Sequence, residues 1–109
     1  LGDFSYDELM VKGADVYARS CAACHGYEGQ GLGSVFPALA GSSMALNDMA
    51  GHIDIVLNGK PGTAMQSFSA QLSDVDIAAV ITFERNAWGN NVGDITQPID
   101  VYNWKKGKR

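Results

Sequence analysis

Both cysteines of the 109-residue chain lie in one short segment, where Cys21 and Cys24 are followed directly by His25. On a helical turn, side chains three residues apart face the same way, with Cβ atoms about 5–6 Å apart. Two thiols at that spacing can form thioethers to the two vinyl groups on one edge of a porphyrin. The histidine that follows then brings an imidazole nitrogen to the iron. This is the attachment signature of c-type haem, so we expect one covalently bound haem c.

Three other interpretations of the two cysteines are weaker. A structural zinc site needs four ligands, and only His52 or carboxylates remain to complete one. A redox dithiol of the thioredoxin type should accompany a strand–helix–strand pattern, which the sequence lacks. A structural disulfide would leave His25 unexplained. Zinc and a redox dithiol stay as the minor alternatives.

Four glycines follow the motif, at positions 26, 29, 31 and 33. A dinucleotide-binding fingerprint starting at Gly29 would need glycine at position 34, which is Ser34, and a preceding strand. We therefore expect these glycines to let the backbone turn tightly past the haem edge.

The second axial ligand must be a methionine or His52. Met10 lies on the apolar face of the helix expected before the cysteines, and Met49 shares a face with apolar neighbours, where methionine is ordinarily core filler. Met44 follows the motif histidine by only 19 residues, a short path to the opposite face of the ring. Met65 follows it by 40 residues and is the preferred ligand. His52 is expected to be solvated, as a single histidine on a helix surface usually is.

Histidine–methionine ligation fills both axial positions of the iron and raises the reduction potential. Such an iron carries electrons and does not activate oxygen, whereas an unbound Met65 would allow a peroxidase or gas-sensing role. Pro37, twelve residues after His25, has two interpretations. Either it only breaks the chain in a turn, or its carbonyl accepts the N–H of His25 and fixes the tautomer.

No catalytic residues are evident, because no close pair of carboxylates flanks a pocket for acid–base chemistry. Several aromatic residues could admit electrons, but packing against haem or core explains them more simply. They are Tyr17, Tyr27, Phe68, Trp88 and Trp104.

Three helices are expected to position these residues, and no stretch alternates with period two long enough to suggest a sheet. The first spans residues 7–20 and carries Gly13 on its apolar stripe, which is tolerable if another backbone approaches closely there. The second spans residues 47–57 and is followed by Gly59 as a left-handed cap.

The third helix starts at the capping-box pair Ser73 and Asp76 and ends near residue 86. Loops are expected over residues 26–46 and 59–72. Residues 87–109 form an extension without a predicted element.

The composition fits a single domain over residues 1–109. Val, Leu, Ile and Phe supply 25 residues and the small Ala and Gly another 26, so a large apolar cofactor would help to fill the core. The net charge is −4, and residues 1–104 hold 4 basic against 12 acidic side chains. Such a surface repels phosphate backbones, which excludes nucleic acid as a partner. No apolar run approaches the roughly 18–20 residues of a membrane helix.

The two ends of the chain carry separate expectations. It begins Leu1-Gly2-Asp3, without an initiator methionine or signal peptide, so we expect it to be processed or excised from a larger product. Residues 105–109 hold four of the eight basic side chains. We expect a frayed, solvated end there, with a small anion-binding tail as the alternative.

Together these residues resemble class I cytochromes c over nearly the whole chain. Gly13 and Tyr17 stand where that family has the glycine and aromatic residue of an N-terminal helix that crosses a C-terminal helix. The resemblance implies an all-α fold of three main helices and loops wrapped around one haem. It also implies that Pro37 holds the proximal histidine and that Met65 is the distal ligand.

The sequence departs from the family at Gln66, where many members have proline after the ligand methionine. This departure removes a rigid element from the loop that carries the ligand.

Residues 56–68 and 71–94 look like a narrower branch, the cytochrome c domain fused to subunit II of bacterial caa-type cytochrome c oxidases. In that family the domain passes electrons to the dicopper centre of the same subunit. The resemblance implies a place on the periplasmic side of the cytoplasmic membrane, in a parent protein that can be membrane-anchored.

The same resemblance implies redox partners: a donor cytochrome or quinol–cytochrome c oxidoreductase, and the dicopper centre of an oxidase as acceptor. A free periplasmic carrier is the alternative, and a haem peroxidase or gas sensor is the third interpretation. The acidic body of the chain favours a basic partner and rates that fall with salt.

Overall fold

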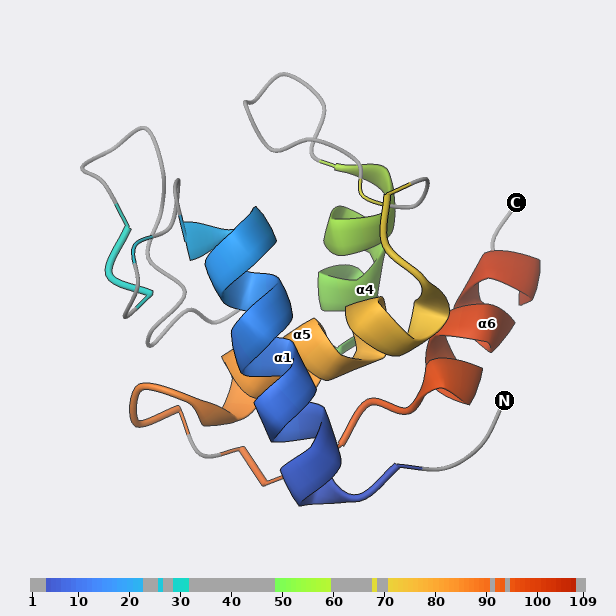
Figure 1. Cartoon of the computed structure of the whole chain (residues 1–109). Helices are drawn as coiled ribbons and strands as arrows, with labels where there is room; N and C mark the ends of the chain where they lie inside the picture. The colour runs from blue at the N-terminus through green and yellow to red at the C-terminus, as the bar shows by residue number, and fades with distance from the viewer. Residues whose placement is uncertain are drawn as a thin grey trace.

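The computed structural model describes residues 4–22, 26, 29–31, 49–59, 68, 71–90, 92–93 and 95–107. This part of the chain contains helices and no strand, as Figure 1 shows. The helices are α1 (Tyr6–Ser20), α4 (Met49–Asn58), α5 (Asp74–Asn86) and α6 (Pro98–Gly107). The first three agree closely with the predicted helices, so the all-α prediction is confirmed. The predicted loops lie largely outside the described residues.

Local capping explains where α1, α4 and α5 begin or end. Ser5 and Glu8 form a complete capping box, in which each side chain accepts the backbone N–H of the other, at 3.0 and 2.7 Å. Ser73 accepts the N–H of Asp76 at 3.1 Å, as predicted. Gly59 has φ +73° and ends α4 in the left-handed conformation expected of it. These contacts satisfy backbone groups that a helix terminus leaves without partners.

Helix α1 lies across α5 with almost no space between the backbones (Figure 1). A Cβ added to Gly13 would contact the Ala79 carbonyl and would lie 2.6 Å from the Cβ of Phe83. A side chain of any size is therefore excluded at this position. The close approach that the sequence predicted at Gly13 is confirmed, and its partner is the helix predicted for the crossing.

Helix α5 is the centre of the described structure, because it contacts α1, α4 and α6. Its residues 77–81 are almost completely buried. Apolar side chains from the other three helices join them in one core. They include Val16 of α1, Ile53 and Val56 of α4, and Val101 of α6. None of the helices in the described part of the chain is both long and apolar enough to span a membrane.

Helix α6 is an element that the sequence analysis missed. Pro98 takes its first position, where proline loses no hydrogen bond, and Asp100 accepts the N–H of Gln97 at 2.8 Å. Val101 is fully buried against the core. The expected frayed end is wrong for residues 105–107, which complete α6, and Lys105 lies 2.9 Å from Asp74. Residues 108 and 109 lie outside the described residues.

Two pairs of hydrogen bonds fix the segment that leads into α6. The amide of Gln97 donates to the Phe4 carbonyl at 2.8 Å and accepts the Phe4 N–H at 3.0 Å. The Thr82 hydroxyl of α5 donates to the Thr96 carbonyl at 3.2 Å and accepts the Thr96 N–H at 3.0 Å. The start of the chain and the segment before α6 are thereby joined to the same frame.

The crossing gives a first test. We expect Gly13→Ala to lower the free energy of unfolding of the holoprotein by about 2 kcal/mol. The added methyl must displace backbone atoms of α5, and this outweighs the roughly 1 kcal/mol gained in helix propensity. Chemical denaturation measures the change.

Gly107→Ala is the matched control, because a Cβ there meets no atom within 4 Å. It should leave stability within about 0.5 kcal/mol. A Gly13→Ala protein as stable as the wild type would contradict the close crossing.

Candidate functional site

Cys21 is the one predicted haem ligand or anchor that the described residues include. It follows α1 directly, and its N–H donates to the Tyr17 carbonyl at 2.9 Å, which continues the helical pattern of α1. The side chain is half-buried and packs against the core. The other predicted site residues lie outside the described residues. They are Cys24, His25, Pro37 and Met65.

Ala22, inside the Cys-x-x-Cys-His motif, and Gly26, directly after it, are hydrogen-bonded to each other, and Gly26 is also bonded to α1. The Gly26 N–H donates to the Ala22 carbonyl at 2.8 Å, a bond with the four-residue span of an α-helix. The Gly26 carbonyl accepts the hydroxyl of Tyr17 at 2.6 Å. The residue that follows His25 is thus held one helical turn from Ala22, which directly follows Cys21.

The glycines after the motif adopt backbone conformations that favour glycine. Gly26, Gly29 and Gly31 have φ of +86°, +69° and +77°, which L-residues with a side chain rarely adopt. The tight turning predicted for these three is confirmed. That the turn passes a haem edge stays a prediction, and Gly33 lies outside the described residues.

The Tyr17 hydroxyl stays protonated and can keep donating to Gly26. Burial raises the pKa of Tyr17 well above its ordinary value, and the charges of Glu84 and Cys21 raise it further. Ionisation would place a negative charge in a site that is poorly solvated and already faces acidic groups. The contact that positions the motif is therefore insensitive to pH across the physiological range.

Three aromatic rings pack together beside this contact. The Tyr17 ring lies 4.9 Å from that of Trp88 and 5.6 Å from that of Phe83, and the last two are 5.4 Å apart, centroid to centroid. Phe68 and Trp104 also pack in or against the core. The packing interpretation of these aromatics is confirmed, except for Tyr27, which lies outside the described residues.

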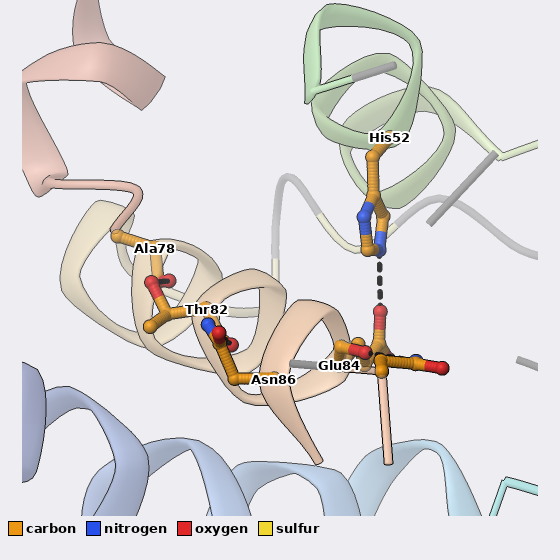
Figure 2. Close-up of polar contacts among 6 residues, drawn as sticks. His52, Ala78, Thr82, Glu84 and Asn86 are labelled. Atoms are coloured by element: carbon orange, nitrogen blue, oxygen red, sulfur yellow. Dashed lines mark hydrogen bonds and ion pairs between the residues drawn. The ribbon is translucent and has the colours of Figure 1, made fainter. Parts of the chain in front are cut away.

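His52 corrects a prediction. It was expected to be solvated, but it is only 4% exposed, and its Nε2 lies 2.5 Å from the carboxylate of Glu84, which is 3% exposed. Figure 2 shows His52 of α4 pointing onto Glu84 of α5. Among the described residues its Nδ1 has no hydrogen-bond partner. The sequence held a signal for this burial, because His52 is three residues after Met49 and four before Val56, on the apolar face.

The remaining candidates for the second axial ligand are unevenly described. Met10 is half-buried on α1, and Met49 is the first residue of α4. Met44 lies outside the described residues. No three His, Cys, Asp or Glu side chains gather as metal ligands in the described ranges.

What the described residues do offer fits a covalently held apolar group. A thiol stands at the end of a helix, against a core built from four helices. The carbonyl after the motif is held by a buried hydroxyl, and the glycines beyond it let the chain turn back at once. Haem c attached at Cys21 would extend the core that α1, α4 and α5 begin.

The buried pair gives a second test. We expect Glu84→Ala to lower the free energy of unfolding by about 3 kcal/mol, because His52 would lose the partner that satisfies it inside the core. Glu84→Gln keeps a hydrogen-bonding group and should lose less. Denaturant titration of the holoprotein measures both.

Asp15→Ala is the control, since it breaks a solvent-exposed ion pair with Arg19 within α1. Exposed pairs contribute at most about 1 kcal/mol. Equal losses for the two alanine variants would show that the buried pair does not join α4 to α5.

Comparison with known proteins agrees with this geometry. A family model described as "Cytochrome C oxidase, cbb3-type, subunit III" matches residues 8–83. The chain is 32% identical over 99 residues to the cytochrome c subunit of a quinone alcohol dehydrogenase from Gluconobacter oxydans. That match covers 82% of this chain but only 21% of the relative, so the chain spans about a fifth of that subunit.

Two further likenesses involve smaller differences in length. Cytochrome c-552 of Thermus thermophilus is 34% identical over 96 residues, covering 74% of this chain and 71% of the relative. Cytochrome cL of Hyphomicrobium denitrificans has a similar structure, with a TM-score of 0.57 and 23% sequence identity. The match covers 74% of this chain and 48% of cytochrome cL. This last likeness supports the class I cytochrome c fold. The chain belongs to the family of cytochrome c domains described as cytochrome c oxidase, cbb3-type, subunit III.

Proposed function

We propose that the chain carries a single haem c that is held by Cys21 and Cys24 and ligated by His25 and Met65. The carbonyl of Pro37 orients His25 by accepting its N–H. As a cytochrome c domain, the chain serves electron transfer with a covalently bound haem c. The position of Cys21 at the end of α1, followed by a tied Gly26, is the observation that carries the assignment of the anchors.

The bound haem supplies a one-electron iron couple, and the chain's own residues give it a fixed, dry setting. Tyr17 holds the Gly26 carbonyl on one side of the motif. Core residues of α4 and α5 exclude water beside it, as the burial of Ile53, Ile77 and Ile81 indicates. Ligation by both His25 and Met65 would suit the haem to accept and donate electrons, which is the proposed activity.

We further propose that the domain works on the periplasmic side of a bacterial membrane, fused to subunit II of a caa-type oxidase. It would take electrons from a cytochrome or a quinol–cytochrome c oxidoreductase and pass them to the dicopper centre. Support comes from the resemblance of residues 56–68 and 71–94 to that branch. The exposed acidic residues of α1, Asp7, Glu8 and Asp15, favour a basic docking face.

A free periplasmic carrier is the second candidate, and one observation favours it. The match to cytochrome c-552 covers most of that relative's length. The complete reading frame separates the two functions. We expect it to encode a dicopper domain and membrane helices ahead of this domain. A frame with only a signal peptide there would contradict the fusion and leave the free carrier.

Axial ligation is tested by Met65→Ala. We expect the ferric protein to lose its thioether–iron absorption band and the reduction potential to fall, because the sulfur ligand stabilises the reduced iron. Visible absorption and redox titration measure the two changes.

Met10→Ala is the control, since Met10 is a half-buried methionine of α1 outside the proposed ligand set. It should keep the band. An unchanged spectrum in Met65→Ala would transfer the ligand role to Met44, Met49 or His52.

A further inference from the structure

Trp88 has an unusual backbone for a bulky residue. It lies two residues after α5, which ends at Asn86, and has φ +56°. A large aromatic residue rarely adopts this left-handed conformation. Such conformations persist when the surroundings fix them, and they concentrate at functional sites.

Hydrogen bonds to the last turns of α5 fix the backbone around Trp88. The Ala87 N–H donates to the Phe83 carbonyl at 2.8 Å, and the Asn90 side chain donates to the Glu84 carbonyl at 2.7 Å. Further along, the Gly93 N–H donates to the side chain of Asn86 at 2.6 Å. The turn after α5 is therefore joined rigidly to the helix. This also fixes the direction in which the indole points.

The indole lies on the backbone of the glycine segment that follows the haem-attachment motif. A Cβ added to Gly29 would lie 2.6–2.9 Å from three atoms of the Trp88 ring. Gly29 is buried and has φ +69°, so it has the conformation and the lack of side chain that this contact requires. The indole also packs on the rings of Tyr17 and Phe83.

Tyr17 and Trp88 thus act on the same segment. Tyr17 binds the Gly26 carbonyl through its hydroxyl, and the ring of Tyr17 contacts the indole that covers Gly29. The Gly29 N–H also donates to the Gly26 carbonyl, at 3.1 Å. Gly26 directly follows His25 in the sequence, so whatever holds Gly26 and Gly29 restrains the backbone that carries this histidine.

We propose that Trp88 is a positioning residue that clamps Gly29, and through it Gly26, against the crossing of α1 and α5 and so holds His25 in place at the haem. The inference rests on the proposed ligation by His25. The clamp acts through Gly29 and not through contact with the iron, so its removal should loosen the segment before it changes the overall fold.

The experiment compares Trp88→Ala with Trp88→Phe in the ferric holoprotein. Hydrogen exchange of the Gly26 and Gly29 amides should become about tenfold faster in Trp88→Ala. The reduction potential should fall, because a loosened segment admits water to the haem. Trp88→Phe keeps a ring over Gly29 and should restore most of both values. The Gly59 amide, at the end of α4, should exchange as in the wild type.

Trp104→Ala is the matched control, because Trp104 is also partly buried against the same core but belongs to α6. It should reduce stability without changing Gly26 or Gly29 exchange or the potential. Equal changes in the two alanine variants, or faster exchange in Trp88→Ala with an unchanged potential, would overturn the clamp.

Gly29→Ala tests the contact from its other side and covers the case in which Trp88→Ala fails to fold. The methyl group must displace the indole, so we expect the exchange and potential changes of Trp88→Ala. Gly89→Ala is its control, since Gly89 has φ +84° but a Cβ there meets no atom within 4 Å. Equal effects from the two substitutions would assign the change to backbone strain and overturn the contact.

The haem spectrum of the wild type separates this inference from the proposed function. A wild-type protein that matures without covalently bound haem would overturn the proposed function. The clamp alone would be overturned by a different result. The wild type would then hold haem with His–Met ligation, and the Trp88 variants would show the wild-type amide exchange rates and reduction potential.

Discussion

Where α1 crosses α5, the two backbones meet with no side chain between them, because the residue of α1 at that point is Gly13. Every residue placed near the haem-attachment motif depends on this approach. It brings Tyr17, one turn further along α1, against Phe83 and within the electrostatic reach of Glu84. Because Cys21 follows the same helix, the crossing also sets where the proposed anchor lies relative to the end of α5.

Within the part of the chain that the structure describes, the core contains a hydrogen-bonded polar pair that is as buried as its apolar neighbours. His52 and Glu84 join α4 to α5 at 2.5 Å, in a place where either group alone would be costly to desolvate. A pair of this kind fixes the relative position of two helices more narrowly than apolar packing does, since hydrogen bonds depend on direction. Glu84 lies near the end of α5, and the turn that carries Trp88 follows this end. The buried pair and the turn therefore define the same side of the site.

The C-terminal part of the chain completes the frame without touching the motif in the described residues. Helix α6 packs on α4 and α5 through Val101, and Gln97 joins its start to Phe4 near the beginning of α1. The post-helical turn between α5 and α6 has a different use, because it aims the Trp88 indole back toward the glycine segment. The chain after α5 thus contributes α6 to the core and the Trp88 indole to the site.

The sequence by itself determined three helices, the close approach at Gly13, the cap at Gly59 and the cytochrome c family. These depend on spacing along one segment, such as the Cys-x-x-Cys-His motif or an apolar stripe. It could not place His52 opposite Glu84 or Trp88 on Gly29, because each contact joins residues more than thirty positions apart. Helix α6 was missed because its stability comes from Val101 in a core formed by other helices. Tertiary packing alone decided these, since burial and contact between distant segments depend on how the helices cross and not on local periodicity.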